Sequence, residues 1–293
     1  MNRQLPLAQR WRCVAGGQVL RLGRCVTFLS VALLMLAGLA QAEERSRVLH
    51  LCVDELPLYP WRSNEGHGLA PRGLDFLLIE TAAQRLGLRL EIAAQPWKRC
   101  QIDLQRGQQD AALGMSFRAE RLELGVFPMQ DSEAQPDDAL RMRRERYSFY
   151  KRSDQGLSWD GHRLIGAEGQ PLRDLVVGAQ AGYSVVEQLR SLGLKVDDGT
   201  RSAEANLEKL LRGRVQAVAL LAGEGDDLIK RDPRWSQSIS RLDPPLVEKS
   251  YYLVFSRAFF AAQPQLARQL WAELARVRES ADYRRAEAEL LRR

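Results

Sequence analysis

The chain has little histidine, little cysteine and, beyond its first 42 residues, no long apolar run. Its three histidines are His50, His67 and His162, and their spacing is not that of metal ligands. We therefore expect no metal and no cofactor. The sequence also shows no Ser–His–Asp arrangement, no Cys–His arrangement and no phosphate-binding loop, so it favours a binding protein over an enzyme.

The N-terminal segment has the pattern of a secretory signal peptide. Residues 1–25 contain five arginines and no acid, an apolar run follows over 26–39, and A-Q-A stands at 40–42. The apolar run is shorter than the roughly 20 residues that a membrane-spanning helix needs. We expect residues 1–42 to be a cleaved signal peptide and the remaining chain to be a soluble periplasmic protein.

The formal net charge of +6 comes mostly from this leader. Without the five leader arginines, 38 basic residues face 37 acidic ones. A nearly neutral chain of about 250 residues is not expected to bind nucleic acid. It is long enough for one large domain or for two lobes.

Two cysteines follow the leader, Cys52 on an expected strand and Cys100 on an expected helix. An even number of cysteines in an oxidising compartment is typical of a disulfide. Two separate buried thiols are the alternative, and the sequence leaves both open.

The stretch L-Q-R-G-Q-Q-D-A-A-L-G-M-S-F-R-A-E-R, residues 104–121, organises the chain. It predicts a helix end with a left-handed Gly107, a buried strand over 110–114 and a polar turn. Ligands bind at the carboxyl ends of strands in open α/β sheets. Ser116, Arg118 and Arg121 are therefore placed to hold a small anionic group.

The same pattern returns in the second half, where L-L-R-G-R-V-Q-A-V-A-L at 210–220 echoes 104–114. This internal duplication of a β-α-β-α-β unit predicts two similar lobes rather than one continuous sheet. Two chain crossings, near Arg146 and near Ser250, would join the lobes. The ligand would then lie in the cleft between them, and closure would be a hinge motion.

Four local patterns give further expectations. Asp75 and Ser202 are each placed to cap a helix, and Ser184 with Glu187 forms a capping box. The charge run R-M-R-R-E-R at 141–146 is typical of a solvated connector.

Taken in order, these parts resemble the periplasmic solute-binding proteins of polar-amino-acid ABC importers, the bacterial extracellular family 3 type. The resemblance is carried by the 104–121 stretch, by P-R-G-L-D-F at 71–76, by V-G-A-Q-A-G-Y-S at 177–184 and by the repeat at 210–220. It implies a type II, two-lobed α/β fold, with lobe 1 formed by 43–145 and completed by 251–293, and lobe 2 formed by 146–250.

The resemblance also implies ligand-binding roles for individual residues. Arg121 would hold a carboxylate, Ser116 would be the hydroxyl of the turn, and Tyr183 and Ser184 would lie at a helix N-terminus facing the same anion. The aromatic shelf of the family falls on Tyr59 and Trp61. From the residues alone, Trp97 belongs either to this shelf or to the core, and Asp54 either faces the cleft from the end of the first strand or caps the turn after it.

The sequence departs from the family at two places. Leu221 stands where an aspartate takes the ligand ammonium, with Glu224 three residues on as a substitute, and Arg118 replaces a threonine-type residue. Both changes favour a more anionic or ammonium-free ligand. The expected partners are a small-molecule ligand and an inner-membrane ABC permease, and the expected state is a monomer.

Two other functions remain open. One is a periplasmic enzyme on the same scaffold, of the cyclohexadienyl dehydratase type, with Glu120, Glu224 or Asp54 as the acid or base. The other is a ligand sensor that docks on a membrane receptor.

Overall fold

The computed structural model describes residues 48–63, 73–130, 134–166 and 175–291. The chain divides into two units, and all but one of the described residues belong to the second, residues 49–293. The expected signal peptide lies outside the described residues. No helix among those described is long and apolar enough to cross a membrane.

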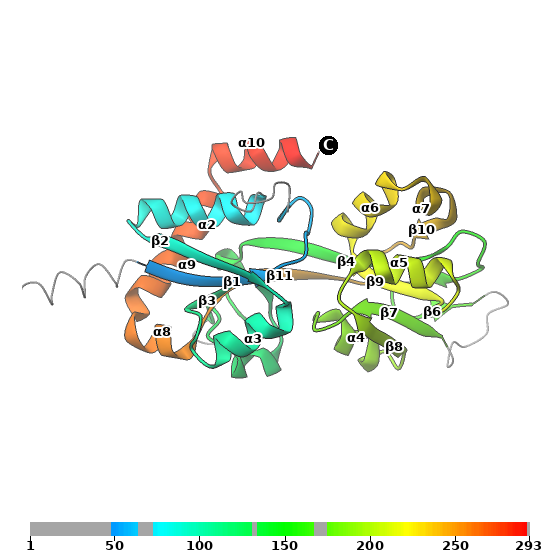
Figure 1. Ribbon diagram of the computed structural model, residues 1–293, viewed down its shortest axis with the longest axis horizontal. Helices are drawn as coiled ribbons and strands as arrows, with labels where there is room; N and C mark the ends of the chain where they lie inside the picture. Colours follow the sequence, from blue (N-terminus) through cyan, green and yellow to red (C-terminus); the bar gives the residue numbers. More distant parts are fainter. Residues whose placement is uncertain (1–47, 64–72, 131–133, 167–174, 292–293) are drawn as a thin grey trace, which may run out of the picture. The chain divides into compact units, whose positions relative to one another are not determined.

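The first half of the second unit is a β-α-β-α-β arrangement (Figure 1). Its elements are β1 (Val48–Asp54), α2 (Leu74–Arg85), β2 (Arg89–Gln95), α3 (Trp97–Gln105) and β3 (Ala111–Ser116). β1 lies between β2 and β3 and runs parallel to β3. Gly87 and Gly107 follow the two helices with φ of 67° and 68°, and the left-handed Gly107 is as predicted from the sequence.

The second half repeats this order, and the repeat confirms the duplication seen in the sequence. Its elements are β7 (Val176–Gln180), α4 (Val185–Ser191), β8 (Lys195–Thr200), α5 (Ala203–Leu211) and β9 (Ala217–Leu221). β7 lies between β8 and β9 and runs parallel to both, as β1 lies between β2 and β3.

Two long antiparallel strands, β4 (Arg143–Arg152) and β11 (Val247–Phe255), run between the halves (Figure 1). β11 pairs with β3, and β4 pairs with β9, so the ladder continues from β2 to β8. The expectation that the halves would not share one continuous sheet is therefore wrong, because both crossing strands hydrogen-bond to each other and to the flanking sheets. The residue boundaries of the two lobes stay a prediction.

Further elements complete the two halves. They are the 3-10 helices Ala119–Glu123 and Asp138–Leu140, β5 (Ser158–Trp159), β6 (Leu164–Ile165), α6 (Ala222–Arg231), α7 (Pro233–Ser238), β10 (Ile239–Arg241), α8 (Arg257–Ala262), α9 (Pro264–Arg278) and α10 (Ala281–Leu290). β5 and β6 pair as a separate antiparallel hairpin.

The core follows from alternation along the buried strands. In the first half, Leu51 and Val53 belong to one cluster, whereas Cys52 faces the opposite side, toward α3. Cys52 and Cys100 form a disulfide there, with their Cα atoms 5.5 Å apart. The sheet of the first half is thus buried on both faces. Polar side chains at the carboxyl ends of its strands line the space where the halves meet.

Candidate functional site

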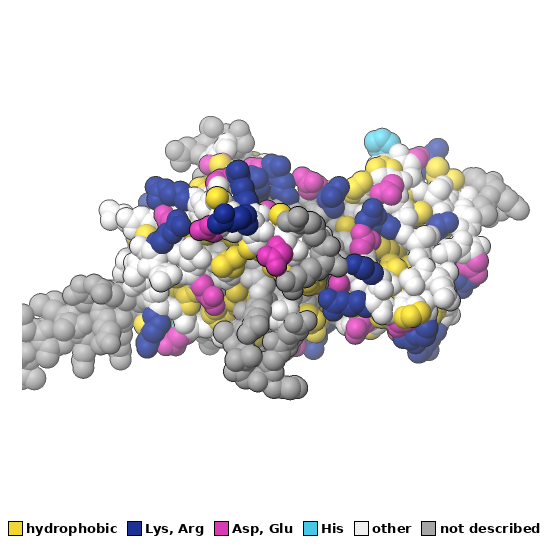
Figure 2. All heavy atoms as spheres, turned by 90° about the horizontal axis from the view of Figure 1, so that it is seen from above, with side chains coloured by type: hydrophobic (Ala, Val, Ile, Leu, Met, Phe, Trp, Pro, Cys, Tyr) yellow, Lys and Arg dark blue, Asp and Glu magenta, His cyan; other side chains and the backbone are white. Residues whose placement is uncertain are grey.

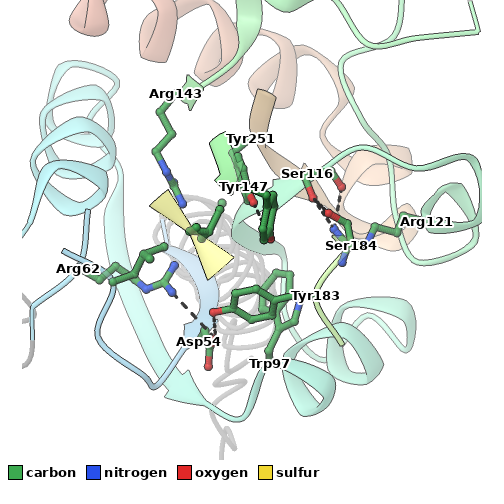
Figure 3. A pocket seen from close by; sticks show the side chains of 13 residues that line it. Asp54, Arg62, Trp97, Ser116, Arg121, Arg143, Tyr147, Tyr183, Ser184 and Tyr251 are labelled. Carbon is green, nitrogen blue, oxygen red and sulfur yellow. Dashed lines mark hydrogen bonds and ion pairs between the residues drawn. The ribbon is translucent and has the colours of Figure 1, made fainter. Parts of the chain in front are cut away.

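A small hollow of about 20 Å³ lies at the carboxyl ends of β1, β3 and β9, against β4 and β11. This is room for about one water molecule. Figure 3 shows its polar side chains converging from both halves of the chain. It is lined by Asp54, Leu58, Arg62, Trp97, Gly114, Ser116, Arg121, Arg143, Tyr147, Tyr183, Ser184, Leu221 and Tyr251.

Arg121 reaches the hollow from the 3-10 helix Ala119–Glu123 and is only 7% exposed. Its Nη1 donates to the carbonyl and the hydroxyl of Ser116 at 2.8 and 2.9 Å, and its Nη2 donates to the Gly182 carbonyl at 3.1 Å. Burial lowers the pKa of Arg121, but a guanidinium stays charged in proteins. Among the described residues, this buried cation has only neutral oxygen partners.

Ser184 stands at the N-cap position of α4, but its side chain does not cap the helix. Its Oγ instead accepts a hydrogen bond from the Ser116 hydroxyl at 2.9 Å and another from Lys249 Nζ at 3.1 Å. The prediction that Ser184 forms a capping box with Glu187 is therefore wrong. The hydroxyl is used for a contact between the two halves.

Lys249 adds a second cation beside Arg121. Burial, together with the nearby positive charges of Arg121 and Arg118, lowers its pKa to about 8. Lys249 donates hydrogen bonds to Ser184, and its Nζ lies 6.0 Å from the ring centroid of Tyr147. Among the described residues, no carboxylate pairs with it. The right side of the hollow in Figure 3 is thus a positively charged corner lined with hydroxyls.

Asp54 lies at the end of β1 on the opposite side of the hollow (Figure 3). Its Oδ2 accepts a hydrogen bond from the Tyr183 hydroxyl at 2.9 Å and lies 4.0 Å from Arg62 Nη2. Burial and the Asp54 charge raise the pKa of Tyr183, so its hydroxyl stays protonated and donates. The Asp54–Tyr183 bond is a second contact that joins the halves.

Arg143 begins β4 and is 3% exposed. Its Nη1 donates to both carboxylate oxygens of Asp75, at 2.7 and 2.6 Å. Asp75 therefore lies inside the first turn of α2 as the partner of a buried cation, and the expectation that it caps the helix is wrong.

The charge run 141–146 is not a solvated connector either. Arg143 and Glu145 point inward from β4, where they are 3% and 8% exposed, while Arg144 and Arg146 point outward. This alternation continues to Tyr147, whose hydroxyl accepts a hydrogen bond from Tyr251 at 3.1 Å inside the hollow.

Six of the ten predicted ligand-binding residues line the hollow. They are Asp54, Trp97, Ser116, Arg121, Tyr183 and Ser184. The structure places the other four elsewhere. Arg118 forms an ion pair with Glu120 at 3.1 Å, and Tyr59 donates to the Leu290 carbonyl at 2.6 Å.

The remaining two do not line the hollow. Trp61 is buried, with its ring 5.0 Å from the Arg143 guanidinium. Glu224 is buried and accepts from Gln180 Nε2 at 3.3 Å, and burial raises its pKa to about 8. Glu224 lines a neighbouring hollow with Tyr59.

Sequence reasoning missed Arg62, Arg143, Tyr147, Tyr251 and Lys249. The period-2 pattern from Arg143 through Glu145 to Tyr147 was the available signal, because it predicts a strand that presents these side chains on one face. Among the described residues, no group of three or more His, Cys, Asp and Glu side chains is placed to hold a metal ion.

No protein-family model and no curated protein matches the chain. Solved structures do match it. A mutant of ArgBP from T. maritima aligns with a TM-score of 0.64 and 18% identity, covering 86% of this chain and 99% of that one. A putative ABC-transporter binding component from Wolinella succinogenes, complexed with lysine, gives 0.62 and 14%, covering 82% and 93%.

A histidine kinase sensor domain with similarity to periplasmic binding proteins gives a TM-score of 0.64 and 18% identity, covering 84% of this chain and 96% of that one. Together these similarities define the fold: the chain has the two-lobed α/β architecture of periplasmic binding proteins.

Proposed function

We propose that the protein is a periplasmic solute-binding protein that holds a small carboxylate-bearing solute in the hollow lined by Arg121. The observation that carries this proposal is the Arg121 guanidinium, 7% exposed and bonded only to neutral oxygens of Ser116 and Gly182 among the described residues. A buried charge is stable only when it is paired or well hydrogen-bonded, and a carboxylate is the bidentate partner that a guanidinium favours.

The surroundings support the same ligand chemistry. Hydroxyls of Ser116 and Ser184 and the ammonium of Lys249 adjoin Arg121, and each can donate to an anion. Trp97 supplies an apolar wall to the same hollow. On this proposal, the contacts from Ser116 to Ser184 and from Tyr183 to Asp54 belong to the closed form of a clamp.

Ligand screening by thermal shift, followed by titration calorimetry, tests the proposal. The panel contains amino acids, dicarboxylates and polyamines, and a carboxylate-bearing compound should raise the melting temperature. Arg121→Met should weaken that ligand by about 2–5 kcal/mol, because it leaves a buried carboxylate without its partner. Arg106→Met, at an exposed position after α3, is the matched control.

A folded protein that binds no carboxylate, or that binds one equally well after Arg121→Met, would refute the proposal. The next partner in the cell is proposed to be an ABC permease. A sensor on the same fold would bind the ligand alike, and the sensor-domain match shows that such proteins share this architecture. Co-purification with a permease rather than with a receptor would distinguish the two.

None of the three acid or base candidates predicted from the sequence is free in the hollow. Glu120 is exposed and paired with Arg118, Glu224 lines a different hollow, and Asp54 is already bonded by Tyr183. Direct assay of a cyclohexadienyl acid tests this alternative, and turnover would overturn the binding-only proposal.

A further inference from the structure

The hollow contains two more buried guanidiniums on the side away from Arg121. Arg62, from the loop after β1, and Arg143, from β4, are 5% and 3% exposed. Figure 3 shows both on one side of the hollow, with Tyr147 and Tyr251 between Arg143 and the Ser116–Arg121 corner.

Three nitrogen atoms of these two guanidiniums have no hydrogen-bond acceptor in the part of the chain that the structure describes. The Nε of Arg62 and the Nε and Nη2 of Arg143 are buried and have no hydrogen-bond partner among the described residues. Apart from the close pair of Arg143 with Asp75, the ion pairs of these two arginines are long. Arg62 lies 4.0 Å from Asp54, and Arg143 lies 3.9 Å from Glu145. Buried donors of a charged group are costly to leave unpaired, so an acceptor is expected to reach them.

Arg143 is also held rigidly in place. Its Nη1 is bound by Asp75, and its guanidinium carbon lies 5.0 Å from the Trp61 ring centroid and 4.6 Å from that of Tyr251. A Cβ added to Gly114 would lie 3.2 Å from Nη1 and 3.5 Å from Nη2, so the absence of a side chain there makes room for the guanidinium. A cation fixed in this way is preorganised for one ligand geometry.

The balance of charge favours an anion with more than one carboxylate. Asp54 lies against Arg62 and Asp75 binds Arg143, but Arg121 and Lys249 have no carboxylate partner among the described residues. The site is therefore left with an excess of about two positive charges. Glu145 offsets this positive charge only in part. Burial raises its pKa to about 7, so its carboxyl group is partly protonated at neutral pH.

The hollow offers little to an ammonium group. Leu221, 1% exposed, presents an apolar side chain to it. The one lining carboxylate, Asp54, already accepts from Tyr183.

We infer that the solute is a short dicarboxylate without an ammonium group. One carboxylate binds Arg121 and Ser116, and the other accepts from the open donors of Arg62 and Arg143. The carbon chain between them passes Tyr147 and Tyr251. This inference rests on the proposed function, which it deepens by naming the ligand class and the residues that select it.

Calorimetry with ligand pairs that differ in one carboxylate tests the inference. The pairs are succinate with butyrate and glutarate with pentanoate, and L-glutamate serves as the ammonium-bearing counterpart of glutarate. We expect each dicarboxylate to bind at least about tenfold more tightly than its monocarboxylate, the usual scale of one charge-assisted contact. L-glutamate should bind more weakly than glutarate.

Variants distinguish the two ends of the ligand. Arg62→Gln should weaken the dicarboxylate about tenfold or more and leave the monocarboxylate unchanged, whereas Arg121→Met should weaken both. Arg143→Lys should act like Arg62→Gln, and the Arg62 variant carries the test if loss of the Asp75 contact unfolds the protein. Arg106→Gln is the control for an arginine outside the hollow.

The outcomes separate this inference from the function on which it rests. Equal binding of mono- and dicarboxylates, with Arg121→Met still weakening both, overturns the dicarboxylate assignment and leaves the solute-binding proposal standing. Tighter binding of L-glutamate than of glutarate overturns the ammonium-free class. Failure of all carboxylates to bind the folded protein refutes the proposed function itself.

Discussion

The hydroxyl oxygens of Ser116 and Ser184 lie 2.9 Å apart, although 68 residues separate them in the chain. Ser116 ends β3 and Ser184 precedes α4, so this hydrogen bond joins the two duplicated halves across the hollow. The same Ser184 oxygen accepts from Lys249. A residue placed to cap a helix has therefore become part of the candidate site.

Replacing Ser184 by alanine should reduce ligand affinity more than it reduces stability. The change removes the acceptor of Ser116 and Lys249, and a net hydrogen bond is worth about 1 kcal/mol. Ser202→Ala is the matched control, because Ser202 does cap its helix by accepting from Ala205 N at 3.2 Å. It should cost about 1 kcal/mol of unfolding free energy without changing affinity. Urea denaturation and calorimetry on both variants check this, and the reverse pattern would contradict it.

Ligand affinity should fall as pH rises through about 8, the value to which burial lowers the pKa of Lys249. An anion bound beside Arg121 favours the charged ammonium, so above this pH binding must take up a proton. Affinity should then drop by up to about tenfold per pH unit. The neighbouring Tyr147 stays neutral in this range because burial raises its pKa far above 10.

Lys249→Met supplies the control for this pH dependence. It should bind the ligand more weakly at pH 7 and show a flat profile between pH 7 and 9. Calorimetry at three pH values measures both proteins. An unchanged slope in the variant would assign the titration to another group.

Local sequence rules predicted the fold well because the strongest signals are short-range. Gly87, Gly107, Gly193 and Gly213 all have φ between 67° and 75°, each just after a helix, as an αL stop requires. The helix spacing and the repeated strand order followed from patterns that span fewer than 20 residues. Figure 2 shows basic and acidic side chains interspersed on the face in view, as expected of a chain whose charge is nearly balanced after the leader.

The site was predicted only in part because its partners are distant in sequence. Asp75 looks like a cap until Arg143, 68 residues away, is brought beside it. Arg62 and Lys249 carry no local signature, and only the pairing of β4 with β11 and the loop after β1 brings them near the hollow. Long-range pairing of buried charges was not predictable from periodicity and capping rules.

Stability should fall as pH rises from about 4.5 to 8, in part through Glu224. Burial raises its folded pKa to about 8, above the ordinary value of 4.5, so folding takes up a proton in this window. The protonated form contributes its full stability below pH 4.5, and this contribution is lost once the pH has passed 8. Glu224→Gln should flatten the decline, and Glu204→Gln, at an exposed position on α5, should not. Urea unfolding at pH 5, 7 and 9 measures the difference; parallel curves for wild type and Glu224→Gln would contradict it.

Removing the Cys52–Cys100 disulfide should lower the unfolding free energy by about 4 kcal/mol. The bond closes a loop of 48 residues, and the chain-entropy model gives this value for a loop of that length. The double variant Cys52→Ala and Cys100→Ala tests it by urea denaturation. A reductant should destabilise the wild type and leave the double variant unaffected, and an equal response of both would show that the bond contributes nothing.

Breaking the Asp75–Arg143 pair from one side should be among the most destabilising single changes in the protein. Both side chains are fully buried, with 1% and 2% of their surfaces exposed, and Asp75→Asn leaves the Arg143 charge without its counter-ion. The expected cost is about 3–5 kcal/mol of unfolding free energy. The double variant Asp75→Leu and Arg143→Met should recover much of this loss, because apolar side chains of similar volume replace a buried ion pair at little cost. Since Arg143 is then absent, that stable double variant should also bind succinate no more tightly than butyrate. A single variant as stable as the wild type would show that the pair does not hold α2 and β4 together.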